Sequence, residues 1–411
     1  MKYDCFEIEN YKGVQKASVD LEGRMNPGIY TLVGLNESGK TTLLEAVDFL
    51  RNGIANSSRV NATKLIPRRL RSSFTGDVRV TASLSLSAQD KKKIEEAVAS
   101  CGFKDISLGD DFKFTRTFHY IKSDYQGEYA RTEIEVSASK KKSQKDPKPL
   151  IRDEHPDVFE SLDTQVLKLL PPVVYYSDFL YEFPSKIYID DGADSPLQKF
   201  YKDVFADILA SLEGVDLSLA ELAERIKSPK GDHIAQVDTL MNQLTDKVTR
   251  EVFSKWNEIF GNKHEGKKIQ FSCDVEKGEE DKPDRAFIKV SLIDGPDPYE
   301  IRERSLGFKW FFAFLLLTIF RKHRKKNQDE LLYLLDEPAS NLHPTAQKKI
   351  LQTLKQLGEG NSRLIYTTHS HFLINPEWLE GAFIVKNLAL DNEEDPLYSE
   401  NEATNIVATR G

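Results

Sequence analysis

The fold of this chain is decided by one stretch, Gly34-Leu35-Asn36-Glu37-Ser38-Gly39-Lys40-Thr41, which has the pattern G-x-x-x-x-G-K-[ST]. It follows the apolar run 29–33 and leads into Thr42 and the helix-like sequence 42–47. In this strand, loop and helix context the pattern predicts a phosphate-binding loop, and an ordinary glycine-rich turn is the weaker interpretation. Backbone N–H groups of the loop and the N-terminal end of the helix would bind phosphate oxygens. We expect Lys40 to reach the β- and γ-phosphates of a nucleoside triphosphate and the Thr41 hydroxyl to ligate Mg²⁺.

Length and composition indicate a large folded protein. The 411 residues predict one large domain with an insertion, or two or three lobes. The longest apolar run, 310–320, has 11 residues, whereas a membrane-spanning helix needs roughly 20. The N-terminus has no basic-then-apolar signal segment, and Cys5, Cys101 and Cys273 are too far apart to indicate a disulfide framework or a zinc site. We therefore expect a cytoplasmic protein with no membrane partner.

The net charge of −8 argues against a uniformly basic surface for nucleic acid. Basic residues nonetheless gather in three places, where a solvated surface is favoured over a binding patch. These clusters are Lys64 with Arg68, Arg69 and Arg71; Lys140–Lys142 with Lys145 and Lys148; and Arg321–Lys326.

A second landmark is the apolar run 331–335, which ends in Asp336 and Glu337. A continuous apolar run is typical of a parallel strand that is buried on both faces. Its carboxyl end is where an open α/β sheet binds ligands. There Asp336 is expected to hold Mg²⁺, and Glu337 to polarise a water for attack on the γ-phosphate. Alone, the acids before Pro338 are also compatible with a simple turn.

Two further segments carry candidate residues. The strand 363–368 is followed by His369 and His371, and a histidine there is by default structural or exposed. Ser305 and Gly307 precede an aromatic and apolar helix, where a hydroxyl, backbone amides and the helix dipole could bind an anion. The alternative is a simple N-cap before a buried helix.

Together these motifs resemble the ATP-binding-cassette superfamily, in particular its RecF/SMC-like branch and the OLD-type ATPases of phage defence. Four segments carry the resemblance. They are an opening strand and turn at 6–13, the loop and first helix at 34–46, a strand common in the OLD-type group at 172–179, and an acidic strand with a dimer loop at 336–344. With His369, the motifs extend over most of the chain. The resemblance implies an α/β ATPase head with a mixed central sheet, an antiparallel β-subdomain and a helical insertion.

The resemblance also implies a mechanism that uses ATP and Mg²⁺. His369 would contact the γ-phosphate and sense its loss, with His371 the weaker candidate. Two copies would sandwich two ATP molecules, so that Ser305 and Gly307 of one copy touch the γ-phosphate held by Lys40 of the other. ATP would close this homodimer, or a higher homo-oligomer, and hydrolysis would reopen it.

The chain departs from the family pattern in three ways. The signature Leu-Ser-Gly-Gly-Gln is here Arg304-Ser305-Leu306-Gly307-Phe308. No glutamine marks the usual metal- and water-contacting loop; Gln89 lies too early, and the region around Ser177 and Asp178 is the positional candidate. About 40 residues follow His371, too few for the Toprim nuclease domain of OLD proteins. We therefore expect a standalone ATPase subunit without a nuclease.

The remaining sequence predicts three parts: an N-terminal lobe at 1–180, a helical insertion at 181–265 and a C-terminal lobe at 266–411. Alternation predicts strands, and apolar spacing of three and four predicts helices. Strands are expected at 78–86, 132–136, 271–274 and 286–293, helices over 196–262, a polar loop at 140–148 and a charged link at 322–330.

The leading functional hypothesis is an ATPase that dimerises around ATP, senses DNA or a foreign protein, and regulates a separate effector, such as a nuclease, in anti-phage defence. The alternative is a RecF-like clamp that binds DNA during repair, with salt-dependent affinity. A transporter motor subunit is disfavoured because 265 residues separate Lys40 from Ser305. A metabolic kinase is disfavoured as well, because its mechanism would give no role to Ser305 or His369.

Overall fold

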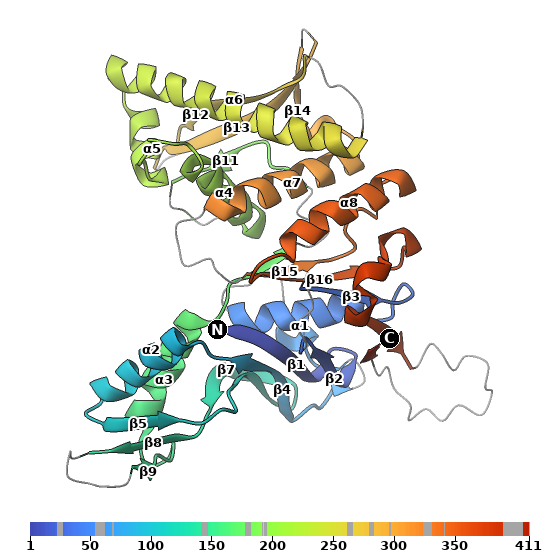
Figure 1. Ribbon diagram of the computed structural model, residues 1–411. Coiled ribbons are helices and arrows are strands. Elements are labelled where there is room, and N and C mark those ends of the chain that lie inside the picture. Colours follow the sequence, from blue (N-terminus) through green and yellow to red (C-terminus); the bar gives the residue numbers. More distant parts are fainter. Residues whose placement is uncertain are drawn as a thin grey trace. The chain divides into compact units, whose positions relative to one another are not determined.

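A computed structural model of the chain describes residues 1–22, 28–53, 62–67, 70–140, 147–176, 182–190, 192, 195–260, 266–278, 283–295, 297–323, 331–340, 342–388 and 406–410. The candidates Ser177 and Asp178, and parts of the three basic clusters, lie outside these ranges. The chain forms two compact units (Figure 1). Unit 1 comprises Met1–Tyr176, Asp329–Pro338 and Leu354–Gly411, and unit 2 comprises Ser177–Gln328 and Ala339–Thr353.

Unit 1 contains a six-stranded sheet that carries the phosphate loop. Its strands, in spatial order, are β10 (Val173–Tyr176), β15 (Leu332–Leu335), β16 (Arg363–Thr368), β3 (Ile29–Val33), β17 (Ala382–Asn387) and β18 (Ile406–Arg410). The first five are parallel, and β18 runs antiparallel to β17. Every residue of β15 and β16 is buried, as the continuous apolar sequence of β15 predicts for that strand. The predicted mixed central sheet is confirmed.

A second sheet of unit 1 is antiparallel, which confirms the predicted β-subdomain. Its strands, in spatial order, are β2 (Val14–Asp20), β1 (Lys2–Tyr11), β4 (Gly76–Ser85), β6 (Lys113–Ile121) and β7 (Asp124–Glu133). Helix α1 (Lys40–Asn52) contacts strands of both sheets, and Figure 1 shows it between β1 and β3. Its apolar residues Leu43, Leu44, Val47 and Leu50 belong to one continuous core with both sheets. This packing fixes α1 behind the phosphate loop.

The rest of unit 1 consists of a small sheet and short helices: β5 (Lys104–Leu108), β8 (Val136–Ser139), β9 (Lys148–Pro149), α2 (Ala88–Ser100), α3 (Pro156–Leu169) and the 3-10 turns η1 (Ala62–Lys64), η6 (His371–Leu373) and η7 (Pro376–Gly381).

The single strand predicted over 132–136 is wrong. Glu133, the last residue of β7, pairs with Lys113 in the large antiparallel sheet, whereas Val136 pairs with Leu108 in the small one. Between them, the carbonyl oxygen of Glu135 accepts a hydrogen bond from the N–H of Gly109 at 2.8 Å. Alternation of apolar residues reports which way side chains face, but it does not show that the chain changes its pairing partner there.

Unit 2 combines a four-stranded antiparallel sheet with helices, three of which lie in the predicted helical region 196–262. The helices are α4 (Pro196–Ala210), α5 (Leu219–Lys227), α6 (Gly231–Phe260), α7 (Leu306–Phe320) and the start of α8 (Pro344–Leu357), with turns η4 (Ile301–Glu303) and η5 (Arg321–His323). The strands are β11 (Ile187–Tyr188), β12 (Lys268–Glu276), β13 (Arg285–Asp294) and β14 (Asp297–Glu300). The strands predicted near 271–274 and 286–293 are therefore confirmed.

The apolar helix α7 is a core helix of unit 2. The ring of Trp256 in α6 lies 4.8 Å from that of Phe308 and 4.9 Å from that of Phe311. Arg321, which follows α7, was predicted to lie on a solvated surface, but it is 8% exposed and pairs with Asp207 at 3.4 Å. A buried arginine needs such a partner, so this cluster prediction is wrong for Arg321.

No helix within the described ranges has both the length and the apolar character needed to cross a membrane. The three-part division at 180 and 265 stays a prediction.

Candidate functional site

The loop between β3 and α1 takes a conformation that depends on glycine. Gly39, the residue before α1, has a φ of 101°, which residues with a side chain rarely adopt. A Cβ atom at Gly34 would lie 2.4 Å from the carbonyl oxygen of Val385 and 2.5 Å from Oγ of Ser38. The chain approaches itself too closely there for any other residue. The loop therefore needs glycine at both positions, at Gly39 for its backbone conformation and at Gly34 for lack of space.

The outer part of the loop is exposed. Leu35 is 79% exposed, and Asn36 and Glu37 are exposed as well. Thr41 and Thr42 fall in the first turn of α1, where the helix dipole favours an anion.

The side chain of Lys40 lies inside the loop. Its ammonium donates hydrogen bonds to the carbonyl oxygens of Gly34 and Leu35 at 2.9 and 2.8 Å, and lies 3.3 Å from Oε1 of Glu337. The residue is only 5% exposed. Its partners are two neutral carbonyls and one carboxylate, so a phosphate oxygen entering the loop would compete for an ammonium that is already in place.

Asp336 joins the helix after the loop to the end of β15. Its Oδ1 accepts hydrogen bonds from Oγ1 of Thr41 at 3.0 Å and from Oγ1 of Thr367 at 2.7 Å. Its backbone N–H donates to the carbonyl oxygen of Tyr176 at 3.0 Å. Because β15, β16 and β3 are adjacent parallel strands, side chains that follow their carboxyl ends meet at one edge of the sheet.

Glu337 lies at the centre of the site. Its φ of 45° is unusual for a residue with a side chain, and its backbone N–H donates to Oγ1 of Thr367 at 2.7 Å. Its Oε2 lies 2.8 Å from Nδ1 of His369 and 3.3 Å from the backbone nitrogen of that residue. The left-handed turn after β15 thus brings the carboxylate between Lys40 and His369. The ring of His371 packs on Phe372 instead, at 4.0 Å between centroids.

The residues at this edge suit Mg²⁺ bound together with a phosphate. No group of three or more His, Cys, Asp or Glu side chains within the described parts of the chain could hold a metal by itself. Mg²⁺ at phosphoryl-transfer sites, however, commonly takes one or two carboxylates plus phosphate and water oxygens. The hydroxyl of Thr41 and the carboxylate of Asp336 are oxygen donors in contact with each other. The buried Oγ of Ser38 in the loop has no hydrogen-bond partner among the described residues, as expected where a ligand supplies it.

A cavity of about 660 Å³ opens beside the loop, within the size range of small-molecule sites, roughly 300–1,000 Å³. Part of its lining is the loop itself: Glu37, Gly39, Lys40, Thr41 and Thr42. The cations Lys12, Lys64 and Arg71 line it as well, and together with Lys40 they outnumber the acid Glu37. Such a lining favours a polyphosphate. The basic cluster around Lys64 and Arg71 therefore borders the candidate site.

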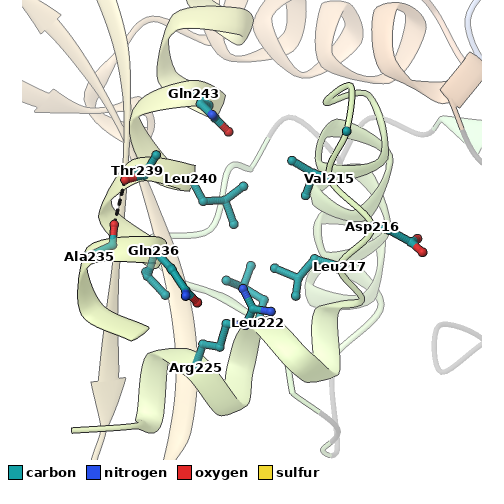
Figure 2. Close-up of a pocket in the computed structure, with 12 residues that line it drawn as sticks. Val215, Asp216, Leu217, Leu222, Arg225, Ala235, Gln236, Thr239, Leu240 and Gln243 are labelled. Atoms are coloured by element: carbon teal, nitrogen blue, oxygen red, sulfur yellow. Dashed lines mark hydrogen bonds between the residues drawn. The ribbon is translucent and has the colours of Figure 1, made fainter. Parts of the chain in front are cut away.

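Unit 2 has a second cavity, of about 480 Å³, that lacks this chemistry (Figure 2). Leu217, Leu222 and Leu240 point into it, and its only charged lining residues are Asp216 and Arg225. With one charge of each sign, its lining has no net positive charge to bind a triphosphate. The phosphate-loop cavity is therefore the better nucleotide site.

Two tyrosines in the segments around the site are buried, and their phenols are neutral. Burial, followed by the nearby carboxylate of Glu45, raises the pKa of Tyr11 well above its usual value. Tyr11 precedes Lys12, whose ammonium bonds to Glu45 on α1. Burial also raises the pKa of Tyr366, whose hydroxyl donates to the carbonyl oxygen of Leu373 at 2.5 Å. This bond ties β16 to the segment after His369.

Ser305 caps the N-terminus of α7 in unit 2. Its Oγ accepts a hydrogen bond from the N–H of Phe308 at 3.4 Å, and Gly307 lies in the first turn of the helix. This cap is the structural interpretation considered above. The contact of Ser305 and Gly307 with a phosphate held by a second copy stays a prediction, as do the chemical roles of the other site residues.

Two residues of the site were not predicted from the sequence. Thr367 bonds to both acids, and its one sequence signal is a polar residue near the end of a buried strand. Ile406 packs on the loop: a Cβ at Gly39 would lie 2.4 Å from its Cδ1. Its backbone N–H donates to the carbonyl oxygen of Gly13 at 3.1 Å. No local pattern indicates that this distant strand returns to the loop.

Comparison with known proteins gives a family and several distant likenesses. The sequence model of a family described as "AAA ATPase domain" matches residues 1–171 and 188–374. An uncharacterized protein of Methanocaldococcus jannaschii is 37% identical over 83 residues, which span 20% of this chain and only 21% of that protein. Among solved structures, an Smc head bound to the C-winged helix domain of ScpA has a TM-score of 0.49 at 14% identity, with 100% of this chain and 98% of that chain covered. The SMC head domain from Thermotoga maritima has a TM-score of 0.40 at 11% identity, with both chains fully covered.

Proposed function

Because the chain belongs to the AAA ATPase domain family, we propose that it is an ATPase whose reaction takes place where β3, β15 and β16 end. The observation that carries this proposal is the meeting of loop and acids at one edge of the six-stranded sheet, where Lys40 lies 3.3 Å from Glu337 and Thr41 bonds to Asp336 at 3.0 Å. A phosphate loop beside two acids that follow another strand of the same parallel sheet is the arrangement that phosphoryl transfer to water requires.

Each residue has a distinct task in this proposal. Lys40 exchanges its carbonyl partners for the β- and γ-phosphate oxygens and neutralises charge that builds up during transfer. Thr41 and Asp336 would hold Mg²⁺, which would supply further charge neutralisation on the phosphates. Glu337 accepts the proton of the attacking water. His369, bonded to Glu337, orients that carboxylate and responds to the γ-phosphate.

We further propose that ATP closes two copies of the chain around two nucleotides. Leu35 at the tip of the loop is 79% exposed and Leu306 at the start of α7 is 39% exposed, which supports burial of both against a second copy. Ser305 and Gly307, at the N-terminus of a 15-residue helix, supply amides and a positive dipole end for the γ-phosphate of the other copy.

The cellular role that we propose is regulation of a separate effector, such as a nuclease, in anti-phage defence. Support comes from the likeness of residues 172–179 to a strand common in OLD-type ATPases. The competing role is a RecF-like DNA clamp. The two differ in their ligand: a clamp binds DNA with an affinity that falls steeply with salt, whereas an effector co-purifies with the ATP-bound chain.

Steady-state release of phosphate from ATP tests the proposed activity. The wild-type chain should turn over ATP with Mg²⁺ present, and Glu337→Gln should bind ATP but lose about 10²-fold or more of the rate, since general-base catalysis contributes roughly 10²–10⁴-fold. A wild-type chain that releases no phosphate from ATP with Mg²⁺ present would overturn the proposal.

A further inference from the structure

Thr367 occupies a position that no motif of the chain assigns. It lies one residue before the end of β16, between the strands that precede the acids and the phosphate loop. Its side chain is completely buried in a strand of which every residue is buried. A buried hydroxyl is stable only when it is hydrogen-bonded, so its partners define what it does.

The hydroxyl of Thr367 both donates and accepts a hydrogen bond, and its two partners are the two acidic residues. It donates to Oδ1 of Asp336 at 2.7 Å and accepts from the backbone N–H of Glu337 at 2.7 Å. A hydroxyl can do both at once because it has one hydrogen and two lone pairs. One atom therefore fixes the carboxylate of the first acid and the backbone of the second.

The backbone at Glu337 needs this support. Its φ of 45° lies in the left-handed region, which a residue with a side chain occupies only where its surroundings enforce it. The bond from its N–H to Thr367 holds that turn from the neighbouring strand, and the turn aims the carboxylate at Lys40 and His369.

We propose that Thr367 is a positioning residue that sets the geometry of both acids, Asp336 through its carboxylate and Glu337 through its backbone. This inference rests on the proposed function, because it assigns Asp336 to Mg²⁺ and Glu337 to the attacking water. Thr367 itself touches no phosphate and supplies no proton in the reaction. Through Asp336 it increases the affinity for Mg²⁺, and through Glu337 it increases the rate of the chemical step.

The test compares Thr367→Val, which keeps the shape and removes the hydroxyl, with Thr367→Ser, which keeps the hydroxyl. Thr31→Val is the matched control: Thr31 is 2% exposed on the adjacent strand β3, and its hydroxyl bonds to Tyr366. Rates of ATP hydrolysis are measured against Mg²⁺ and against ATP, and melting is recorded for each variant.

For Thr367→Val we expect kcat to fall about 10- to 100-fold, as is typical when a residue that hydrogen-bonds to a metal ligand is replaced. The Mg²⁺ concentration for half-maximal rate should rise while the KM for ATP stays the same, and Thr367→Ser should restore most of kcat. Thr31→Val should lower the melting temperature without these kinetic changes. A purely structural role would make the two valine variants alike.

The outcomes separate this inference from the proposed function. A wild-type chain that does not hydrolyse ATP refutes the proposed function. A wild-type chain that does, with Thr367→Val equal to it in kcat and Mg²⁺ dependence, overturns the role of Thr367 alone. If Thr367→Val does not fold, Thr367→Ser and Thr367→Cys take its place, because they are close in size and differ mainly in hydrogen-bonding strength. Equal rates for these two would then overturn it.

Discussion

The hydroxyl of Thr41 lies 3.0 Å from Oδ1 of Asp336, and this contact joins residues that are 295 positions apart in the chain. It exists because β3 and β15 flank the same strand, β16, in one parallel sheet. The contact brings the phosphate loop and the acidic strand end into one group of oxygen and nitrogen atoms.

The packing of Ile406 on Gly39 predicts a specific second-site effect. Gly39→Ala introduces a Cβ 2.4 Å from Cδ1 of Ile406 into a residue whose φ is 101°. We expect it to lower the free energy of unfolding by about 2 kcal/mol or more, from backbone strain and overpacking together. Urea denaturation measures this loss, and Ile406→Ala in the same chain should recover part of it because it removes the clash.

Gly102→Ala is the matched control for that experiment. Gly102 has a φ of 88°, but a Cβ there would meet no atom within 4 Å. It therefore reports backbone strain without the clash. A loss at Gly39 no larger than the loss at Gly102 would mean that β18 does not press on the loop.

The proposed dimer predicts that Glu337→Gln accumulates in the ATP-bound form. Glutamine keeps the shape of the side chain but cannot accept the proton of the attacking water, so ATP stays intact between two copies. Light scattering coupled to size exclusion should show the dimer with ATP and a smaller species without it. Glu377→Gln, which alters an exposed pair with Lys355, should not change the mass. A Glu337→Gln chain that remains monomeric at saturating ATP would rule out the sandwich.

The charge cluster around Asp190 in unit 2 predicts a pH-dependent stability. Burial tends to raise the pKa of this carboxyl, but the ammonium of Lys227 at 2.8 Å, the N–H of Ala286 at 2.8 Å and Arg285 at 3.1 Å outweigh it and hold the pKa below its usual range. Since the folded pKa is the lower one, the stabilisation is present above about pH 4 and is lost as the pH falls through the folded value.

Asp190→Asn should therefore cost about 2 kcal/mol of unfolding free energy at pH 7 and clearly less near pH 3. Tryptophan fluorescence during urea unfolding reports it, because Trp256 and Trp310 are buried in unit 2. Asp284→Asn, at an exposed pair with Lys277, should change little. If Asp190→Asn lowered the unfolding free energy equally at both pH values, the lowered pKa of Asp190 would be contradicted.

Much of the site could be predicted from local sequence. The loop, the acidic strand end and the strand before His369 each combine an apolar run with polar residues at its carboxyl end, and parallel strands bring such ends together. Residues 29–47 alone predict strand, loop and helix, and β3 and α1 confirm these elements.

What could not be predicted depends on partners distant in the chain. Ile406 lies in a five-residue strand whose sequence does not reveal which sheet edge it joins. The boundary between β7 and β8 depends on pairing with Lys113 and Leu108, while the alternation of residues continues across it. Arg321 reads as one more surface cation until its buried partner Asp207 is known. Tertiary contacts decide all three.

The measurement that tests the central claim most directly is calorimetric titration of Mg²⁺-ATP into the wild-type chain, Lys40→Ala and Lys16→Ala. Lys16 pairs with Glu9 on the surface and its side chain is 73% exposed, so its loss controls for the removal of one positive charge. We predict saturable binding to the wild type and to Lys16→Ala, and an affinity about 100-fold lower for Lys40→Ala, since removal of a buried charged partner costs roughly 2–5 kcal/mol. An affinity of Lys40→Ala equal to that of the wild type would contradict the account.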